Sequence, residues 1–576
     1  MSKVYATFIP SLNEGFGSFL EYTLSCFFLC KKYNINFVYT NLKNIEHKEW
    51  CEYTCQEKWD EYINNMIKKY FLPKDILTSE QIPSNLTVFD FNNQNEQTFC
   101  INFKELDNHI LYFNSYTLKK NFLYESIKND SIVGFLSDVF FSNNDMVSYY
   151  NPNNINIGAH IRLFTKTDCC NADSRQLYKK GNETDIYFLR LMNQLSDLFY
   201  DKNIDFHIFS QIEDESVFSH YVSNRDNIKI HFHKGNELLS DIYHMCLSDV
   251  LLMSNSSLSS ICNYYGKGIC ISRKYSYELK NSSLIIENDG ILSEENKQHI
   301  LDYVNKKKVQ DFWNNRPCNI NHSSATFLSR EYFDQVEAKK YYVEPHIKTF
   351  AEFEKWKGKK VLEIGCGLGT DSINFARHGA DITVVDLSER SLNICKERFK
   401  VFGLNAKFYH CDLENLSLTV PIEDYDLVYS FGVIHHTPNQ KKAFSEISKY
   451  IGKNTEFRFM VYSKISFKLF WLMMEQKKTS LLNFDSLVRE NSEAQFGCPY
   501  TYTYTFEEIE DILKDNNLHV KKIWKDHIFS YDIPSYKKGM YIKDNYWKDV
   551  DEKTFNSFQR ELGWHTMVIS KLNNTN

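Results

Sequence analysis

Several features that would place the chain in a special class are absent from its 576 residues. No apolar run approaches the roughly 18 residues that a membrane-spanning helix needs, and the start lacks the charged-then-apolar pattern of a signal peptide. The 15 cysteines follow no zinc-site spacing, and no internal repeat or low-complexity tract is present. We therefore expect a cytoplasmic protein with reduced cysteines, in which Cys26, Cys30, Cys51 and Cys55 are packing residues rather than ligands.

An excess of positive charge is also absent. The formal net charge is -7, and 43% of the residues are hydrophobic and 24% charged, as in ordinary globular proteins. This balance gives no general attraction to phosphate backbones, so it disfavours nucleic acid as a partner. It leaves the oligomeric state open.

Strands and helices alternate along most of the chain, which predicts an α/β protein with parallel sheets. A chain of this length is too long for a single hydrophobic core, so it should form several domains. We expect domains at residues 1–150, 151–305 and 310–576, with the main boundary between about 300 and 315. Residues 281–308 are interpreted as polar and helix-forming, and the charge run Lys306–Lys308 as a solvated face.

The segment KKVLEIGCGLGT, residues 359–370, is an apolar strand that runs into a glycine-rich turn and a helix. Gly365, Gly367 and Gly369 permit close backbone approach to a ligand, and the helix start supplies free N–H groups. Glu363 stands before the first glycine. A carboxylate there would repel the pyrophosphate of a dinucleotide, but it suits the cationic amino-acid end of S-adenosylmethionine.

Acidic residues follow the next two strands. Asp386 ends the second strand, about 20 residues past the loop, where an acid can accept both ribose hydroxyls. Asp412 and Leu413 end the third strand and suit the adenine amino group and ring face. The predicted cofactor residues are therefore Glu363, Gly365, Cys366, Gly367, Gly369, Asp386, Leu387, Asp412, Leu413 and Ser430.

From about residue 310 onward the chain resembles the class I S-adenosylmethionine-dependent methyltransferases. The resemblance implies a Rossmann-like fold with a seven-stranded sheet whose last strand, residues 564–570, is antiparallel, and a substrate lid between Val461 and Thr505. Four further segments resemble a subgroup found with sugar and surface-polysaccharide genes: RPCN at 316–319, REYFDQVEAKKYYVEPHI at 330–347, SEAQFGCPYTYTYT at 492–505 and LGWH at 562–565.

Methyl transfer to a hydroxyl oxygen calls for a general base. His435 and His436 follow the fourth strand of this half, on the expected cofactor side, and are the predicted base candidates. Alternatively, one of them caps the next helix or packs on the cofactor. Tyr502, Tyr504 and His565 are weaker candidates.

The N-terminal half carries polar signals at the ends of its predicted strands, where open α/β sheets bind ligands. Arg162 offers a fork for a diphosphate, and Ser256 and Ser257 precede a helix N-terminus that suits an anion. The predicted nucleotide-sugar residues are Gly15, Gly17, His160, Arg162, Ser210, Asp241, Asn255, Ser256 and Ser257.

This half resembles the α-1,2/α-1,6-fucosyltransferases through GFGSFLEYTLSCFFLCKKYNI, HIR, HIFSQIED and DIYHMCLSDVLLMSNSSLSS. The resemblance implies a GT-B-like pair of Rossmann-type domains and a nucleotide-sugar donor, of which GDP-fucose is one candidate, with no metal. The sequence departs from that pattern at Leu163, at Gln211 and in the delayed acid Asp168. An ordinary α/β domain with a serine-rich turn is the alternative interpretation.

Together these patterns favour a bifunctional glycan-modifying enzyme, in which one half transfers a sugar and the other O-methylates a sugar hydroxyl of a glycan acceptor. The alternative is a methyltransferase whose N-terminal half only binds a glycan or nucleotide sugar. Methylation of RNA or protein is disfavoured by the acidic balance.

Overall fold

The structure is a computed structural model. It describes residues 5–8, 16–33, 36–39, 76–78, 87–90, 109–113, 123–142, 146–162, 181–210, 218–233, 236, 238–274, 278–287, 289–475, 484–495 and 498–573. The chain divides into two compact units, Met1–Val304 and Asn305–Asn576, and helix α10 (Glu294–Asn315) crosses the division. No helix among the described residues is long and apolar enough to cross a membrane.

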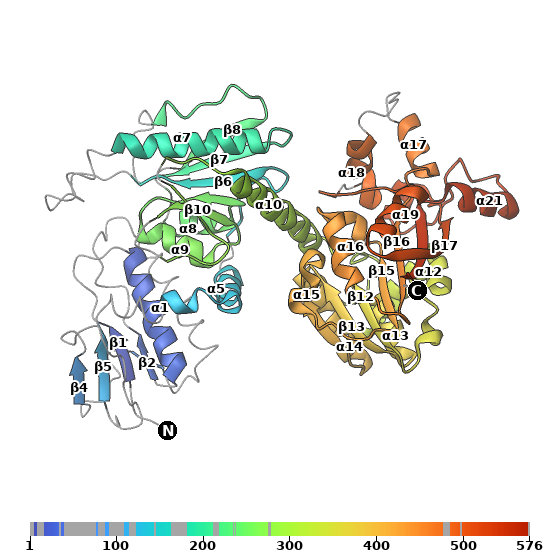
Figure 1. Cartoon of the computed structure of the whole chain (residues 1–576), viewed down its shortest axis with the longest axis horizontal. Coiled ribbons are helices and arrows are strands. Elements are labelled where there is room, and N and C mark those ends of the chain that lie inside the picture. Colours follow the sequence, from blue (N-terminus) through green and yellow to red (C-terminus); the bar gives the residue numbers. More distant parts are fainter. Residues whose placement is uncertain are drawn as a thin grey trace. The chain divides into compact units, whose positions relative to one another are not determined.

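The first unit contains two parallel sheets (Figure 1). The first sheet has the order β3-β2-β1-β5-β4, and all of its strand pairs are parallel. Its strands are β1 (Tyr5–Phe8), β2 (Asn36–Tyr39), β3 (Ile76–Thr78), β4 (Thr87–Asp90) and β5 (His109–Phe113).

One hydrophobic core joins the helix of the first sheet to helices that pack on the second sheet. Helix α1 (Phe16–Tyr33) shares one hydrophobic core with α5 (Asp130–Ser142), α8 (Leu238–Leu247) and α9 (Ser257–Tyr265). Cys26 and Cys30 lie fully buried in this core as free thiols, so their predicted packing role is confirmed. Cys51 and Cys55 lie outside the described residues.

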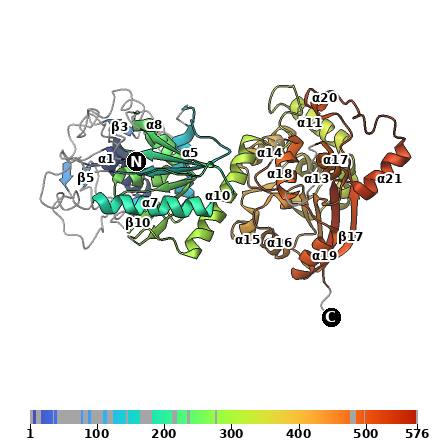
Figure 2. The same ribbon diagram turned by 90° about the horizontal axis from the view of Figure 1, so that it is seen from above.

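The second sheet of the first unit has the order β11-β10-β9-β6-β7-β8 and is also parallel. Helix α7 (Gly181–Leu198) packs along it through Phe188, Leu191 and Leu195 (Figure 2). The strands are β6 (Ile155–His160), β7 (Ile204–Phe209), β8 (Ile228–His233), β9 (Val250–Leu252), β10 (Ile269–Arg273) and β11 (Leu284–Ile286).

Strand β11 corrects the interpretation of residues 281–308 as wholly helix-forming. The three apolar residues of β11 pair with β10 at the sheet edge, and the helix begins only at Glu294. Three residues are too few for periodicity to reveal a strand. The parallel sheets agree with the predicted α/β class, while the GT-B-like pairing stays a prediction.

The second unit is built on one sheet with the order β14-β13-β12-β15-β16-β18-β17. Strand β18 runs antiparallel to both β16 and β17, so the predicted seven-stranded sheet with an antiparallel last strand is confirmed. The strands are β12 (Lys360–Ile364), β13 (Asp381–Asp386), β14 (Lys407–His410), β15 (Leu427–Phe431), β16 (Glu456–Tyr462), β17 (Leu518–Asp526) and β18 (His565–Leu572).

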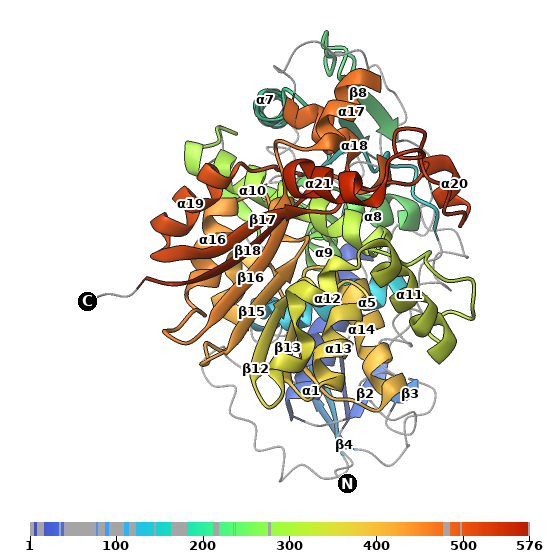
Figure 3. The same ribbon diagram turned by 90° about the vertical axis from the view of Figure 1, so that its right-hand side faces the viewer.

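Helices cover both faces of this sheet (Figure 3). One core packs α16 (Gln440–Ser448) and α19 (Phe506–Asp515) against the sheet, and the other packs α12 (His346–Ala351), α13 (Thr370–Arg377) and α14 (Glu389–Phe402). The alternating directions of strand side chains supply both cores: Leu362 joins the first and Val361 the second. The remaining helices that shape the site are α11 (Arg330–Val343), α17 (Phe467–Glu475), α18 (Phe484–Gln495), α20 (Ile533–Lys537) and α21 (Glu552–Leu562).

Candidate active site

A cavity lies in the second unit at the carboxyl ends of β12, β13, β14 and β15, where open α/β sheets bind ligands. It holds about 1290 Å³ of free space when its open mouth is included. Seven predicted cofactor residues line it: Gly365, Cys366, Gly367, Asp386, Leu387, Asp412 and Leu413.

The glycine loop between β12 and α13 is shaped by steric limits. Gly365 has φ +81°, and a Cβ on it would lie 2.2 Å from Cγ2 of Val433. Gly369 has φ +71°, and a Cβ there would lie 2.4 Å from Sγ of Cys395. Both positions therefore require glycine for backbone conformation and for space.

Glu363, Gly369 and Ser430 do not line the cavity. Glu363 is buried beneath the loop, where the Ser372 hydroxyl donates a hydrogen bond to its carboxyl. Burial, with Asp371 nearby, raises the pKa of Glu363 to about 8. Its contact with a cationic ligand stays a prediction.

Asp386 holds the glycine loop against the end of β13. Its Oδ2 accepts a hydrogen bond from the Gly367 amide at 2.9 Å, and its Oδ1 accepts one from the Ser388 amide at 2.8 Å. Cys366 also hydrogen-bonds this carboxyl.

Lys306 lies in the cavity wall, which corrects the prediction that it belongs to a solvated face. Its ammonium lies 2.9 Å from Oδ2 of Asp412 and 3.0 Å from Oε2 of Glu414. Val309 and Trp313, on the same helix, also line the cavity. The polar composition of α10 gives no sign of this role, because the acidic partners of Lys306 lie more than 100 residues later in the sequence.

The two predicted base candidates have different surroundings. His436 lines the cavity, whereas His435 is fully buried and packs at a tilt of 38° against Tyr462, with ring centroids 3.8 Å apart. Burial alone would lower the pKa of His436, but the neighbouring Cys498 and the Glu493 carboxylate raise it to about 10. Neither base assignment is tested by this geometry, and both stay predictions.

A second cavity adjoins the first and shares six wall residues with it. The shared residues are Cys318, Asn319, Glu344, Tyr462, Glu493 and His565. Every one of the four subgroup segments contributes to this shared wall, and so does β16 through Tyr462. Side chains that lie up to about 250 positions apart in sequence thus meet at one place, which residue spacing could not reveal.

Aromatic rings dominate the second cavity. Tyr462 stacks on Trp564 with centroids 4.4 Å apart, and the Lys468 ammonium lies 4.5 Å from the Trp564 ring centre. Phe467 and Trp471 of α17 and Glu493 of α18 line the wall, so the described part of the predicted lid segment contributes through α17 and α18. Further lining rings are Phe529, Tyr531, Tyr536, Tyr546 and Trp547.

In the first unit, several predicted residues meet at the end of β6. Nδ1 of His160 lies 2.6 Å from Oγ of Ser259 and 3.4 Å from Oγ of Ser254. Burial, with Arg162 nearby, lowers the pKa of His160 to about 3. The His160 ring is therefore a neutral hydrogen-bonding group.

The glycine motif meets the serine turn at the same place. A Cβ on Gly17 would lie 2.6 Å from the amide nitrogen of Leu258, and Oγ of Ser18 lies 3.2 Å from Oγ of Ser257. Ser256 caps α9 by accepting a hydrogen bond from the Leu258 amide. The Ser256 hydroxyl is thus already engaged as the helix cap.

Of the other predicted residues, Arg162, Ser210 and Asn255 follow strands β6, β7 and β9, and Asp241 lies in α8. Arg162 and Ser210 are half-buried and Asn255 is exposed. Burial raises the pKa of Asp241 to about 6. Gly15, Leu163, Asp168 and Gln211 lie outside the described residues.

Comparisons with known proteins identify a methyltransferase domain within the second unit. Residues 361–454 match the family described as a methyltransferase domain. Ubiquinone biosynthesis O-methyltransferase from Coxiella burnetii is 34% identical over 86 residues, which are 15% of this chain and 36% of that protein. The Dechloromonas aromatica protein of the same name is 31% identical over 94 residues, 16% of this chain and 40% of that protein. The chain thus spans well under half the length of these relatives.

Solved structures that match the chain include magnesium protoporphyrin IX methyltransferase from Synechocystis PCC 6803 with bound SAH. It is 16% identical with a TM-score of 0.30, and the match covers 47% of this chain and 100% of that one. The [4+2]-cyclase SpnF is 14% identical with a TM-score of 0.30, and the match covers 47% and 97%. From the family match and the strand order, the second unit contains a class I S-adenosylmethionine-dependent methyltransferase domain.

Proposed function

We propose that the second unit binds S-adenosylmethionine in the first cavity and transfers its methyl group to a hydroxyl oxygen of an acceptor in the second cavity. The observation that carries this proposal is the shared wall of the two cavities. Two ligands that meet at a shared wall can place an acceptor oxygen against the sulfonium methyl group.

The reaction is an in-line displacement in which an oxygen–carbon bond forms and the carbon–sulfur bond breaks. Positive charge on sulfur is lost along the way, so alignment of the two reactants supplies much of the acceleration. Gly365, Gly367 and Asp386 hold the cofactor loop. Lys340 also lines the first cavity, where its ammonium pairs with Asp371 at 2.9 Å and supplies positive charge for the cofactor carboxylate.

A sugar hydroxyl is the acceptor that the second cavity suits best. Ligand sites combine apolar and aromatic walls with a few polar groups that fix orientation. Here aromatic rings provide flat apolar faces, while Asn319, Glu344 and Asn491 provide hydrogen-bonding groups in the same cavity. The four segments that resemble a subgroup found with sugar and surface-polysaccharide genes support the same acceptor class.

Calorimetry with S-adenosylmethionine tests the cofactor part. Asp386→Asn should weaken binding by at least tenfold, because its carboxylate holds the loop and accepts the ribose hydroxyls. Asp381→Asn is the matched control, since Asp381 begins the same strand but is exposed. A folded protein that binds no cofactor would overturn the proposal.

The acceptor part is tested with labelled cofactor and a panel of hydroxylated sugars, phenols and RNA. Transfer to a sugar oxygen, located by mass spectrometry, supports the proposal. Cofactor binding with transfer only to phenols or RNA would overturn the acceptor assignment while leaving the cofactor site in place.

We further propose that the first unit binds a nucleotide sugar, with GDP-fucose as one candidate, and transfers the sugar to the glycan that the second unit methylates. The cluster of His160, Ser254, Ser257 and Ser259 near Gly17 supports a ligand site at these strand ends. Joining both steps in one chain raises the effective concentration of the first product at the second site.

Calorimetry with GDP and with GDP-fucose tests this donor site. Arg162→Ala should reduce binding, because a guanidinium grips a diphosphate with two hydrogen bonds. Arg190→Ala is the control, since Arg190 is exposed on α7 and bonds the Asp289 carbonyl. Donor binding without sugar transfer would favour the alternative, a non-catalytic first unit, and no binding at all would overturn the donor site.

A further inference from the structure

Three side chains of metal-ligand type meet beside the shared wall: Glu344 and His565 belong to that wall, and His527 lines the second cavity next to them. Glu344 follows α11, His527 follows β17 and His565 begins β18. One ligand atom from each lies within 4.8 Å of the other two, and Nε2 of His565 lies 3.9 Å from Oε1 of Glu344. Three protein ligands beside an open cavity form the arrangement of a catalytic metal site, with positions left for substrate.

A fourth residue orients this group. Nε2 of His346 lies 3.0 Å from Nδ1 of His565. When the proton of this bond is on Nδ1, the lone pair of the opposite nitrogen, Nε2, faces Glu344. Hydrogen bonds of this kind fix the ring of a ligating histidine, and their loss lowers metal affinity about 10–100-fold.

The backbone at His527 holds an uncommon conformation that directs its ring to the cavity. His527 has φ +62°, and its carbonyl accepts a hydrogen bond from the Trp564 amide at 2.8 Å. Asn319 and Glu493 also have positive φ, and all three line the second cavity. Such conformations cluster where a site must be preorganised.

We propose that Glu344, His527 and His565 bind a divalent transition-metal ion in the second cavity, beside the shared wall, and that this ion holds the acceptor hydroxyl. Two imidazoles and one carboxylate with open positions suit ions such as Mn²⁺, Fe²⁺ or Zn²⁺ rather than Mg²⁺, which prefers an all-oxygen shell. The site departs from the expectation that the protein uses no metal.

The role of the ion rests on the proposed methyl transfer. An ion lowers the pKa of a bound hydroxyl as it does that of bound water. The hydroxyl releases its proton to water, its oxygen bonds the methyl carbon, and the electron pair of the broken carbon–sulfur bond stays on sulfur. The ion is not oxidised or reduced.

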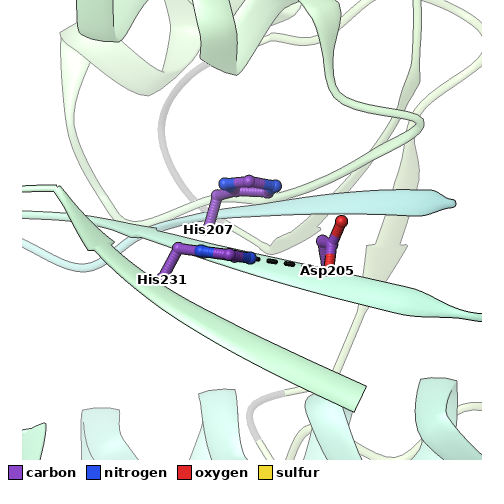
Figure 4. A group of neighbouring side chains, drawn as sticks. All are labelled: Asp205, His207 and His231. Atoms are coloured by element: carbon purple, nitrogen blue, oxygen red, sulfur yellow. Dashed lines mark ion pairs between the residues drawn. The ribbon is translucent and has the colours of Figure 1, made fainter. Parts of the chain in front are cut away.

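A second trio, Asp205, His207 and His231 in the first unit, is less suited to an ion. The rings of His207 and His231 are stacked at 12° with centroids 4.8 Å apart (Figure 4). His207 also contacts His233 and Asn156 through its two nitrogens, at 3.0 and 3.3 Å.

Metal binding can be measured apart from methylation. After treatment of the full chain with a chelator, calorimetry with Mn²⁺ or Zn²⁺ alone should show one site. His527→Gln and Glu344→Gln should weaken it at least a hundredfold, and His346→Gln about tenfold or more. His322→Gln should leave it unchanged, because His322 lines the same cavity but bonds Tyr536 instead.

Cofactor binding by each variant provides the check on folding. Methyl transfer should fall at least tenfold after metal removal and recover when metal is returned. No metal binding in a protein that still binds cofactor and methylates would overturn the metal site but not the proposed function. Stoichiometric metal binding in a protein that methylates no acceptor would support the site and overturn the proposed function.

Discussion

The His436 imidazole and the Glu493 carboxylate form an ion pair at the cavity wall, with Nε2 3.3 Å from Oε1. Nδ1 of the same ring lies 2.8 Å from the Tyr500 carbonyl and donates a hydrogen bond to it. The Tyr462 hydroxyl donates one to Oε1 of Glu493 at 2.8 Å. The pair therefore links the loop after β15 to α18 and to the end of β16.

This pair should make stability depend on pH in a defined direction. The pKa of His436 is raised to about 10, so its contribution is complete below about pH 6.5 and is lost as pH rises through 10. The pKa of Glu493, despite its burial, is lowered to about 2 by His436. Its contribution is complete above its ordinary pKa of 4.5 and is lost as pH falls through 2.

Urea unfolding of wild type and Glu493→Gln, followed by tryptophan fluorescence, measures this dependence. The advantage of the wild type should be greatest between about pH 4.5 and 6.5 and should shrink toward pH 9. Glu510→Gln, at an exposed position on α19, should show a constant difference from wild type. The same constancy for Glu493→Gln would contradict the ion pair.

The ion pair also sets the pH dependence that we expect if His436 is the general base. A protonated His436 cannot accept a proton, so a base role for it predicts a rate that rises toward pH 10 in the wild type. Glu493→Gln should move that rise to lower pH, because it removes the carboxylate that favours the charged ring. A rate without an ionisation near pH 10, or one that the variant does not shift, would rule out His436 as the base.

The cofactor cavity could be predicted from sequence because its parts are local. Gly365 and Gly367 lie between an apolar strand and a helix, and Asp386 and Asp412 end the next two strands. Strand order in such a sheet brings these ends together, so a pattern read along the chain becomes a site in space.

The metal-ligand group beside the shared wall could not be predicted in this way. Glu344, His527 and His565 are far apart in sequence, and each lies at the end of a different element. Only the antiparallel pairing of β17 with β18 sets Asp526 opposite His565 and so brings His527 beside it. The role of Lys306 is hidden similarly, because its partners Asp412 and Glu414 follow β14.

Gly365 offers a test of the cofactor loop. Gly365→Ala should abolish detectable cofactor binding and destabilise the second unit, because the new Cβ would overlap Val433 at a positive φ. Adding Val433→Ala should recover part of the stability, since it removes the nearest atoms but leaves the backbone strain.

Gly403→Ala is the matched control for backbone strain alone. Gly403 has φ +66°, and a Cβ on it would meet no atom within 4 Å. This variant should lose about 1 kcal/mol of stability and keep full cofactor affinity, as measured by calorimetry. Equal losses of affinity in both glycine variants would contradict the steric argument.

In the first unit, the ring of His207 stacks on those of His231 and His233. This histidine stack should make the stability of the unit sensitive to acid. Burial, with His231, His233 and His244 nearby, lowers the pKa of His207 to about 2, and burial with His231 and His244 lowers that of His233 to about 4. Asp205 approaches His231 at 3.5 Å, and Tyr149 stacks on His233 and His244. The buried rings are neutral in the folded state, whereas the unfolded chain takes up protons below about pH 6.5.

Stability from these rings is therefore present above about pH 6.5 and is lost as pH falls through 4. Hydrogen exchange followed by mass spectrometry, corrected for intrinsic rates, should show falling protection of β7 and β8 between pH 6.5 and 4.5. His207→Gln should reduce this pH dependence, while His299→Gln, at an exposed position on α10, should not. Protection that stays constant over this range in the wild type would mean that the stack accepts protons without opening.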